Sequence, residues 1–516
     1  MPVPAYLFCL LMLTTVLSGC VQQPLAPATD SCQSLLASWQ AQRRASGVAD
    51  AQVVPVDAAG LFAVDRLLAS LKPAAGAPDQ QREWLVQAWQ LAFAQRQIEY
   101  MNMAPAVAEA QQQAIEACAQ QGLQAQLAAV ATSGVPPIII SQARVDDSYS
   151  LWRRILGVYP VAKMFVLPRI RAEQEKLRAQ FQHTQLPAST RWYLPASGPR
   201  LSAAAIAQLL AAASNNNALG LPQLPAAALA QLQQQFAPGW AIATESRNDM
   251  PGQPIWLPSP QGVRPDVDEH QPSQYFRASY TRFEGQLLLQ LNYFIWFAAR
   301  PAEHWLDLYS GALDGLVWRV TLAADGHVLG YDSMHQCGCF HQFFPVDPRL
   351  RARPATPGEE PLLVLDEALP DALQTRLVVQ LSAVDHAIQG LAAAPQTMAP
   401  LTTLALQDYA SLRSLPVAGG RRSLFDQRGL IPQSRRLERW VLWPMGVVSA
   451  GAMRQWGHHA TAFVGRRHFD DPFLYEELYE ELYEAPYEAP YEALDEAPWE
   501  TPRPGPVPGL VRQSPE

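Results

Sequence analysis

The sequence predicts an α+β protein, with a mainly helical N-terminal part followed by a mainly antiparallel β part. Three observations predict this class. Apolar residues recur near the helical period of 3.6 through much of residues 32–250. Over residues 251–390 the pattern changes to runs of β-branched and aromatic residues separated by turn dipeptides. From residue 470 to 516 the chain becomes acidic and repetitive, with too few apolar residues to build a core.

The helical part is expected to contain several helices between residues 32 and 130 and further helices over 148–181, 201–213 and 225–236. Glycine and proline separate these periodic segments, as they do at helix ends. Ser202 stands directly before an alanine-rich run, where its hydroxyl can accept a hydrogen bond from a free backbone N–H of the first turn. It is therefore predicted to cap that helix.

The β part is expected to contain two hairpins. Glu284-Gly285 separates two apolar runs, and Asp325-Gly326 separates two more; dipeptides of this kind adopt the tight turns that join antiparallel strands. Residues 391–469 are rich in glycine, arginine, tryptophan and histidine and show little periodicity. We expect this stretch to be a loop-rich segment packed on the β part.

The acidic tail explains the net charge. The chain of 516 residues has a formal charge of −9, and residues 475–500 carry ten acids and no base, so removing ten negative charges leaves +1. A nearly neutral body gives no argument for nucleic-acid binding. The tail repeats a tyrosine every four residues from Tyr475 and then contains prolines that interrupt helices. The sequence predicts that residues 470–516 are disordered and reach toward a protein partner in the envelope.

The N-terminus carries an apolar run over residues 5–17 that ends in Leu17-Ser18-Gly19-Cys20. This four-residue box resembles the lipobox of bacterial lipoproteins. The resemblance implies that residues 1–19 are a signal peptide and that Cys20 is acylated, which anchors the chain to a membrane. Residues 20–31 are then a polar tether. Val21 follows the cysteine where aspartate favours retention in the inner membrane, so the resemblance implies the outer membrane, facing the periplasm.

Four cysteines remain after Cys9 leaves with the signal and Cys20 takes the lipid. An even number in an oxidising compartment suggests disulfides. Cys32 and Cys118 flank a helical stretch rich in alanine and glutamine, and we expect them to pair.

The remaining cysteines stand in His335-x-Cys337-x-Cys339-x-His341, the strongest candidate chemical site. Thiolate and imidazole ligands suit zinc or copper. In a flat strand the outer two side chains would stand about 20 Å apart, so one metal needs a curled chain or a ligand from elsewhere. A Cys337–Cys339 disulfide and inert thiols are the alternatives. The histidines that offer a further ligand are His304, His386, His458, His459 and His468.

A second candidate site lies near the end of the loop-rich segment, where cationic side chains are concentrated. Guanidinium groups bind carboxylates and phosphates, so these residues are candidates for an anion pocket. The alternative is that they pair with acids inside the fold. The candidates are Arg454, His458, His459, Arg466, Arg467 and His468.

Three functions are compatible with these features. The first is a lipid-anchored envelope protein with a binding or scaffolding role. The second is a periplasmic metal-binding or redox enzyme centred on Cys337 and Cys339. The third is direct membrane action through residues 148–181, an apolar stretch with basic ends. Hydrolase and nucleotide-binding signatures such as G-x-S-x-G, H-E-x-x-H and the P-loop do not occur.

Overall fold

A computed structural model describes residues 29–480, except 134–136, 183–185, 355, 366–368 and 396–400. The expected signal peptide, the acylated Cys20, most of the tether and the repeat beyond residue 480 lie outside the described residues. The fold confirms the predicted α+β class, with a large, mainly antiparallel sheet. No helix in the described part is both long enough and apolar enough to cross a bilayer.

The predicted helices form, and several begin as the sequence indicates. Helix α3 starts with Pro78, whose ring suits a first turn. Ser202 Oγ accepts a hydrogen bond from Ala205 N at 3.3 Å and caps α8. The α-helices are α1 Thr29–Ala45, α2 Arg66–Ser70, α3 Pro78–Asn102, α4 Glu109–Ser133, α5 Ile138–Gln142, α6 Leu151–Leu156, α7 Tyr159–Gln182, α8 Ala203–Asn215, α9 Ala226–Phe236, α10 Glu438–Val441 and α11 Leu474–Leu478.

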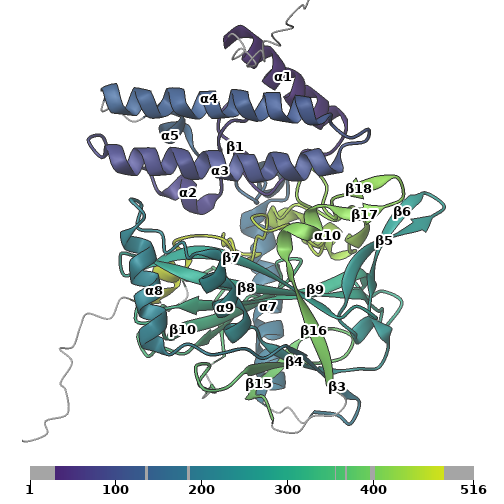
Figure 1. Cartoon of the computed structure of the whole chain (residues 1–516). Coiled ribbons are helices and arrows are strands. Elements are labelled where there is room, and N and C mark those ends of the chain that lie inside the picture. Colours follow the sequence, from purple (N-terminus) through teal and green to yellow (C-terminus); the bar gives the residue numbers. More distant parts are fainter. Residues whose placement is uncertain are drawn as a thin grey trace, which may run out of the picture. The chain divides into compact units, whose positions relative to one another are not determined.

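The first helices form a layer of their own, in which α3 and α4 lie side by side (Figure 1). Cys32 of α1 and Cys118 of α4 form the predicted disulfide, with their Cα atoms 5.5 Å apart. Asn102 Nδ2, at the end of α3, donates to the Arg413 carbonyl oxygen at 2.8 Å. This contact ties the helical layer to the segment that covers the sheet.

The main sheet has eleven strands, most of them antiparallel. In order they are β13 Leu363–Val364, β11 Gln342–Pro345, β10 Val328–His335, β9 Gly311–Leu322, β8 Gln286–Arg300, β7 Ser273–Phe283, β16 Leu401–Asp408, β3 Thr190–Pro195, β4 Gly239–Ala243, β14 Leu377–Leu381 and β15 Ile388–Ala393. Short pairs outside it are β1 Val54–Pro55 with β2 Ala63–Val64, β5 Gln253–Ser259 with β6 Gly262–Asp268, β12 Arg351–Ala352 with β19 Tyr479–Glu480, and β17 Leu415–Val417 with β18 Gly420–Arg422.

Both predicted hairpins are confirmed. Strands β7 and β8 pair antiparallel up to Phe283 and Gln286, and the two residues between them have positive φ angles, 50° at Glu284 and 71° at Gly285. Positive φ at both central residues matches the twist of the flanking strands. Gly326, with φ of 84°, occupies the turn between β9 and β10. These two hairpins form the centre of the sheet.

Three strands of the sheet lie in segments for which the sequence predicted helices or loops. Strands β3 and β4 lie within the range predicted as mainly helical, and β16 lies within the range predicted as loop-rich. Strand β16 pairs with β3 through Leu401–Leu404 and with β7 through Ala405–Asp408, so it joins the two halves of the sheet. Leu404 is its one fully buried side chain, which explains why no alternating pattern marked it.

The first residues of the acidic repeat belong to the fold. Residues 474–480 form α11 and β19, and both Tyr475 and Tyr479 are buried. Tyr475 Oη accepts a hydrogen bond from Thr321 Oγ1 at 3.0 Å. The prediction that disorder begins at residue 470 is therefore wrong for this stretch, because Tyr475 and Tyr479 pack into a core with Phe283 and Phe343.

Each face of the sheet buries its own core. On one face, side chains of α7, α8 and α9 pack against the strands, with Phe181, Ile206 and Phe236 among them. On the other face, the segment after β16 covers the strands, and Met453 and Trp456 pack there. Cys337 and Cys339 belong to this second core, so the predicted chemical site lies where β10 ends beneath the covering segment.

Candidate functional site

Cys337 and Cys339 lie in a tight loop between β10 and β11. The His335 N–H donates to the Cys339 carbonyl at 3.0 Å, and the Gly338 N–H donates to the His335 carbonyl at 2.7 Å. Gly338 has φ of 90°, and a Cβ there would come within 2.6 Å of the Ala460 carbonyl oxygen. Only glycine fits this position without strain. Both cysteines are buried and carry free thiols.

The predicted metal ligands do not come together. His335 Nδ1 lies 3.7 Å from an Asp314 carboxylate oxygen, whereas His341 Nε2 lies 2.8 Å from Asp332 Oδ2. Asp332 in turn pairs with Arg319. Among the residues that the structure describes, no group of three or more histidines, cysteines or acids could hold a metal ion. The chain does curl at Gly338, but each histidine turns to its own carboxylate, so the zinc or copper site is not supported.

A buried charge network lies behind the loop, centred on Asp314 of β9. Arg436 Nη2 donates to Asp314 Oδ1 at 3.0 Å, and His386 Nδ1 lies 2.9 Å from Oδ2. His386 Nε2 also lies 3.5 Å from Asp249 Oδ1, and Phe297 stacks on the imidazole with ring centroids 3.8 Å apart. The Asp314, His386 and Asp249 side chains are fully buried.

The network shifts the pKa values of Asp314 and His386 toward their charged forms. Burial alone would raise the pKa of Asp314, but Arg436, His335 and His386 hold it well below the usual value. Burial alone would lower the pKa of His386, but Asp249 and Asp314 raise it. The two carboxylates therefore favour the charged form of His386.

The pKa values of the two thiols are shifted in opposite directions. The hydrogen bond from Cys339 is the main cause that lowers the pKa of Cys337, and Arg436 adds to it. The same hydrogen bond raises the pKa of Cys339 well above its usual value, and burial raises it further. Arg454 Nε donates to the Cys337 carbonyl at 3.0 Å. Cys337 is therefore the thiol of the pair that ionises first.

Cys339 opens onto a cavity of about 580 Å³ beside α7. Helix α7 lines it with residues that include Val166, Ile170 and Leu177, and Phe340 and Phe463 line it as well. Most of the lining is aliphatic or aromatic, which is typical of small-molecule sites of this size. The polar residues of the lining are Arg169, Glu173, Gln174, Cys339, His341, Glu360 and Glu438.

Two acids that line the cavity have pKa values raised by burial, whereas the arginine at its rim is exposed. Burial raises the pKa of Glu438 to about 7 against the opposing effect of Arg436, and burial also raises the pKa of Glu360. Arg169 is exposed and pairs with no acid among the described residues, whereas Glu173 pairs with Lys176 at 3.5 Å. The rim therefore offers one unneutralised cation, and the interior is apolar and weakly acidic.

Five of the six cationic residues predicted to bind anions bond to partners within the fold, and the sixth, His459, is buried. Arg454 donates to the Val448 carbonyl at 2.6 Å and the Ser449 carbonyl at 3.0 Å, in addition to Cys337. His458 Nε2 lies 2.8 Å from the Ala51 oxygen, and Arg467 donates to the Glu360 carbonyl. Arg466 and His468 both pair with Asp147. The ring nitrogens of His459 are buried without a hydrogen-bond partner. None of the six lines the cavity beside α7. The sequence did not reveal the pairs of Arg466 and His468, because Asp147 is more than 300 residues away.

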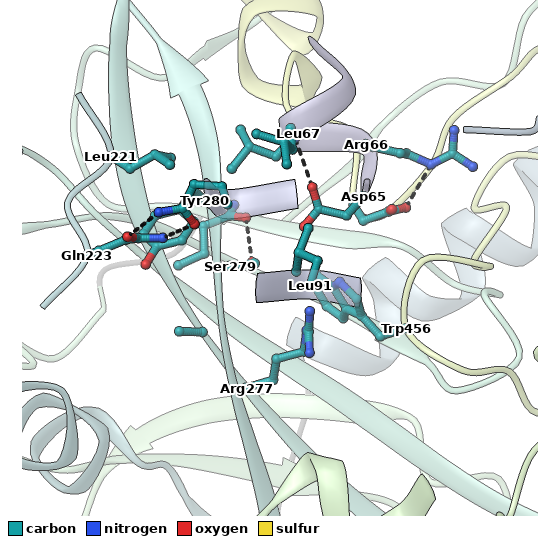
Figure 2. A pocket seen from close by; sticks show the side chains of 15 residues that line it. Asp65, Arg66, Leu67, Leu91, Leu221, Gln223, Arg277, Ser279, Tyr280 and Trp456 are labelled. Atoms are coloured by element: carbon teal, nitrogen blue, oxygen red, sulfur yellow. Dashed lines mark hydrogen bonds and ion pairs between the residues drawn. The ribbon is translucent and has the colours of Figure 1, made fainter. Parts of the chain in front are cut away.

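A smaller polar pocket of about 140 Å³ lies where α2 and α3 meet β7 (Figure 2). Asp65 Oδ1 accepts a hydrogen bond from Leu68 N at 2.8 Å and caps α2, while Gln87 and Gln223 exchange amide hydrogen bonds at 2.8 Å. Arg277 rises from β7 toward the pocket and has no acid partner among the described residues (Figure 2). The amide pair joins α3 to the loop before α9, so we interpret this pocket as a structural junction.

Comparison of the chain with protein-family models, curated proteins and solved structures finds no match. The function is therefore argued from the site alone.

Proposed function

We propose that this protein is a lipid-anchored envelope protein that binds an amphipathic molecule in the cavity beside α7. The observation that supports the proposal is the cavity itself, which combines an apolar interior of about 580 Å³ with one unneutralised arginine at its rim. An aliphatic chain gains free energy by leaving water for such an interior. An acidic head group would remain at the rim, where Arg169 can bind it.

The location of the protein is proposed on the N-terminal sequence. Acylation at Cys20 and the tether that follows would hold the body at the outer membrane, facing the periplasm. The acidic repeat beyond residue 480 would be free to contact a basic or aromatic envelope partner. In this compartment an amphipathic ligand is the kind of molecule that a tethered binding protein would carry or sense.

Filling the cavity is expected to weaken ligand binding. Ile170 lines the cavity, and Ile170→Trp would place an indole where the aliphatic chain should lie. We expect the affinity for a fluorescent fatty acid to fall at least about tenfold, because overpacked sites cannot admit a ligand without moving their walls. Fluorescence titration of the purified protein measures this change.

Val161→Trp is the matched control. Val161 lies on the same helix, is 52% exposed and does not line the cavity, so the same change there should leave the affinity unchanged. Thermal unfolding of both variants checks that each is folded. If both variants bind the fatty acid as the parent does, the ligand does not occupy this cavity and the proposal fails.

A second candidate function is thiol–disulfide exchange, favoured by the hydrogen-bonded pair of free thiols at the cavity wall. A low-molecular-weight disulfide entering the cavity would meet Cys339, the thiol of the pair that lines it. As the Cys339 sulfur attacks, its proton would pass along the hydrogen bond to the Cys337 thiolate, so that a mixed disulfide forms on Cys339 and one thiolate leaves. The leaving thiolate would take up that proton and restore the Cys337 thiolate. Cys337 would then attack the Cys339 sulfur, closing a Cys337–Cys339 bond and releasing the second thiol. The two cysteines are oxidised by two electrons and the entering disulfide is reduced.

This exchange predicts a measurable stoichiometry. Incubation with glutathione disulfide should release two equivalents of glutathione per chain and remove two hydrogens from the peptide that contains both cysteines. Cys337→Ser should stall at the mixed disulfide on Cys339, since no second thiol is available. Failure of the wild-type chain to release glutathione, with both thiols still free, would rule out this function.

A further inference from the structure

Helix α6 and the first turns of α7 expose an unusual number of large apolar side chains. Trp152, Ile155 and Leu156 of α6 are 59–67% exposed, and Met164 and Phe165 of α7 are 69% and 73% exposed. Trp440 of α10 is 66% exposed. We call these six side chains the docking face. Isolated exposed apolar residues are common, but a group of them marks an interaction surface.

The members of the docking face are held together by hydrogen bonds between distant segments. The Ser150 N–H, directly before α6, donates to the Gly446 carbonyl at 2.8 Å. Arg154 Nε donates to the Met445 carbonyl at 2.9 Å. Residues 443–445 also contact both α6 and α7. Helices α6 and α7 are therefore packed against the same short segment, which follows α10 directly.

The surface around the docking face is basic. Between residues 148 and 172 the sequence has five bases and no acid. A groove of about 410 Å³ in this surface is lined by Trp152, Trp440 and four arginines, Arg153, Arg428, Arg435 and Arg439, and no acid lines it. Arg153 lies over the Trp152 ring at 5.4 Å, and Arg439 lies over the Trp440 ring at 4.9 Å.

These arginines are available for a ligand. Among the described residues, Arg153, Arg435 and Arg439 form no ion pair, and Arg428 pairs only with Asp426 at 3.4 Å. The Ser449 hydroxyl also lines the groove and is buried without a hydrogen-bond partner. Tryptophan beside arginine is the composition found at membrane interfaces, where indole rings lie at the head-group level and guanidinium groups bind lipid phosphates.

We propose that the docking face binds the surface of a bilayer that contains anionic phospholipid. The apolar side chains would enter the interfacial zone, and the arginine-lined groove would hold a lipid phosphate. A second copy of the chain is the less suitable occupant, because a two-fold interface would place the same arginines opposite one another. The proposal does not require the cavity to bind a ligand, although Phe165 belongs to both the docking face and the cavity lining.

The test measures vesicle binding without the acyl anchor. Every variant is made in the full chain with Cys20→Ser. The N-terminal segment is then the same in all variants, so its contribution to vesicle binding cancels when they are compared. The docking variant Trp152→Ser/Leu156→Ser/Trp440→Ser changes no residue that lines the cavity beside α7. On vesicles with about one-quarter phosphatidylglycerol, we expect its partition coefficient to fall at least about tenfold, because binding follows the apolar area that leaves water.

The arginines are tested separately. Arg153→Glu/Arg435→Glu/Arg439→Glu should lower binding to the anionic vesicles by roughly fivefold or more for each charge reversed. Binding to vesicles of phosphatidylcholine alone should change little. Sedimentation of the protein with vesicles, at two salt concentrations, measures both effects.

The control variants carry the same kinds of substitution, apolar to serine and arginine to glutamate, at surface positions outside the docking face. Met101, Ile138 and Leu401 are 47%, 69% and 53% exposed, and their triple serine variant should bind vesicles as the parent does. Glutamate at Arg44, Arg82 and Arg264 reverses the same number of charges, and these three side chains are exposed. Equal binding by docking and control variants would overturn the proposal. A wild-type dimer that only the docking variants dissociate, without vesicle binding, would assign the face to a second copy instead.

Discussion

Asp314→Asn is expected to lower the free energy of unfolding by about 3–5 kcal/mol, the cost of leaving buried charges without their partner. Arg436 and His386 both depend on this carboxylate, and all three side chains are almost completely excluded from water. A loss of this size is a large part of the total stability of an ordinary domain. Urea unfolding followed by circular dichroism measures the change.

Two further variants make this result specific. Asp79→Asn removes an acid from an ion pair in which the carboxylate is 80% exposed, and it should change the stability by less than about 0.5 kcal/mol. Asp314→Asn/Arg436→Met removes both charges of the buried pair and should be more stable than Asp314→Asn alone. If Asp314→Asn had the same free energy of unfolding as the wild-type chain, the network would not contribute to stability.

The same network gives the stability a pH dependence at both ends. The pKa of Asp314 is depressed in the fold, so its contribution is complete above the unfolded value near 3.8 and is lost as pH falls toward the folded value. The pKa of His386 is raised, so its contribution is complete below the unfolded value near 6.5 and is lost as pH rises through the folded value. The Asp314→Asn variant should lose the dependence due to Asp314 and weaken the one due to His386, whose pKa Asp249 still raises.

Removing the Cys32–Cys118 disulfide is expected to cost about 4–5 kcal/mol, because it releases a closed loop in the unfolded chain. The two residues are separated by 86 positions, and the bond joins α1 to α4. Cys32→Ala/Cys118→Ala should lower the urea midpoint, and hydrogen exchange should rise first in these two helices. The measurement is made with and without reductant.

The reductant provides the control for this prediction. Dithiothreitol should destabilise the wild-type chain to the level of the double variant and should leave the double variant unchanged. Cys337 and Cys339 are already free thiols, so reduction has no other disulfide to break among the described residues. A wild-type midpoint that does not respond to reduction would contradict the disulfide and the oxidising compartment inferred from the N-terminus.

Local features of the fold could be predicted from the sequence. The helical period identified α3, α4 and α7, and Glu284-Gly285 identified the hairpin of β7 and β8 because only a few dipeptides accept two positive φ angles. Strands β3, β4 and β16 were missed because their pairing is with distant segments. A short strand with one buried side chain leaves no period to detect.

The candidate site was predicted only in part. The Cys337 and Cys339 loop was recognised, but Asp314, His386 and Arg436 come from separate segments that the sheet brings together. One signal was present in the sequence. Asp314 and Arg319 interrupt a largely apolar strand, and charges in such a run indicate buried ion pairs. The cavity beside α7 had no sequence signal, because a cavity depends on packing between elements.

The binding proposal is tested most directly by a crystal structure with a fatty acid that carries bromine at its tail. The proposal predicts anomalous density for bromine inside the cavity, between Ile170 and Phe463, with the carboxylate near Arg169. Bromine density at another place, or an empty cavity at a concentration that saturates the fluorescence titration, would contradict it.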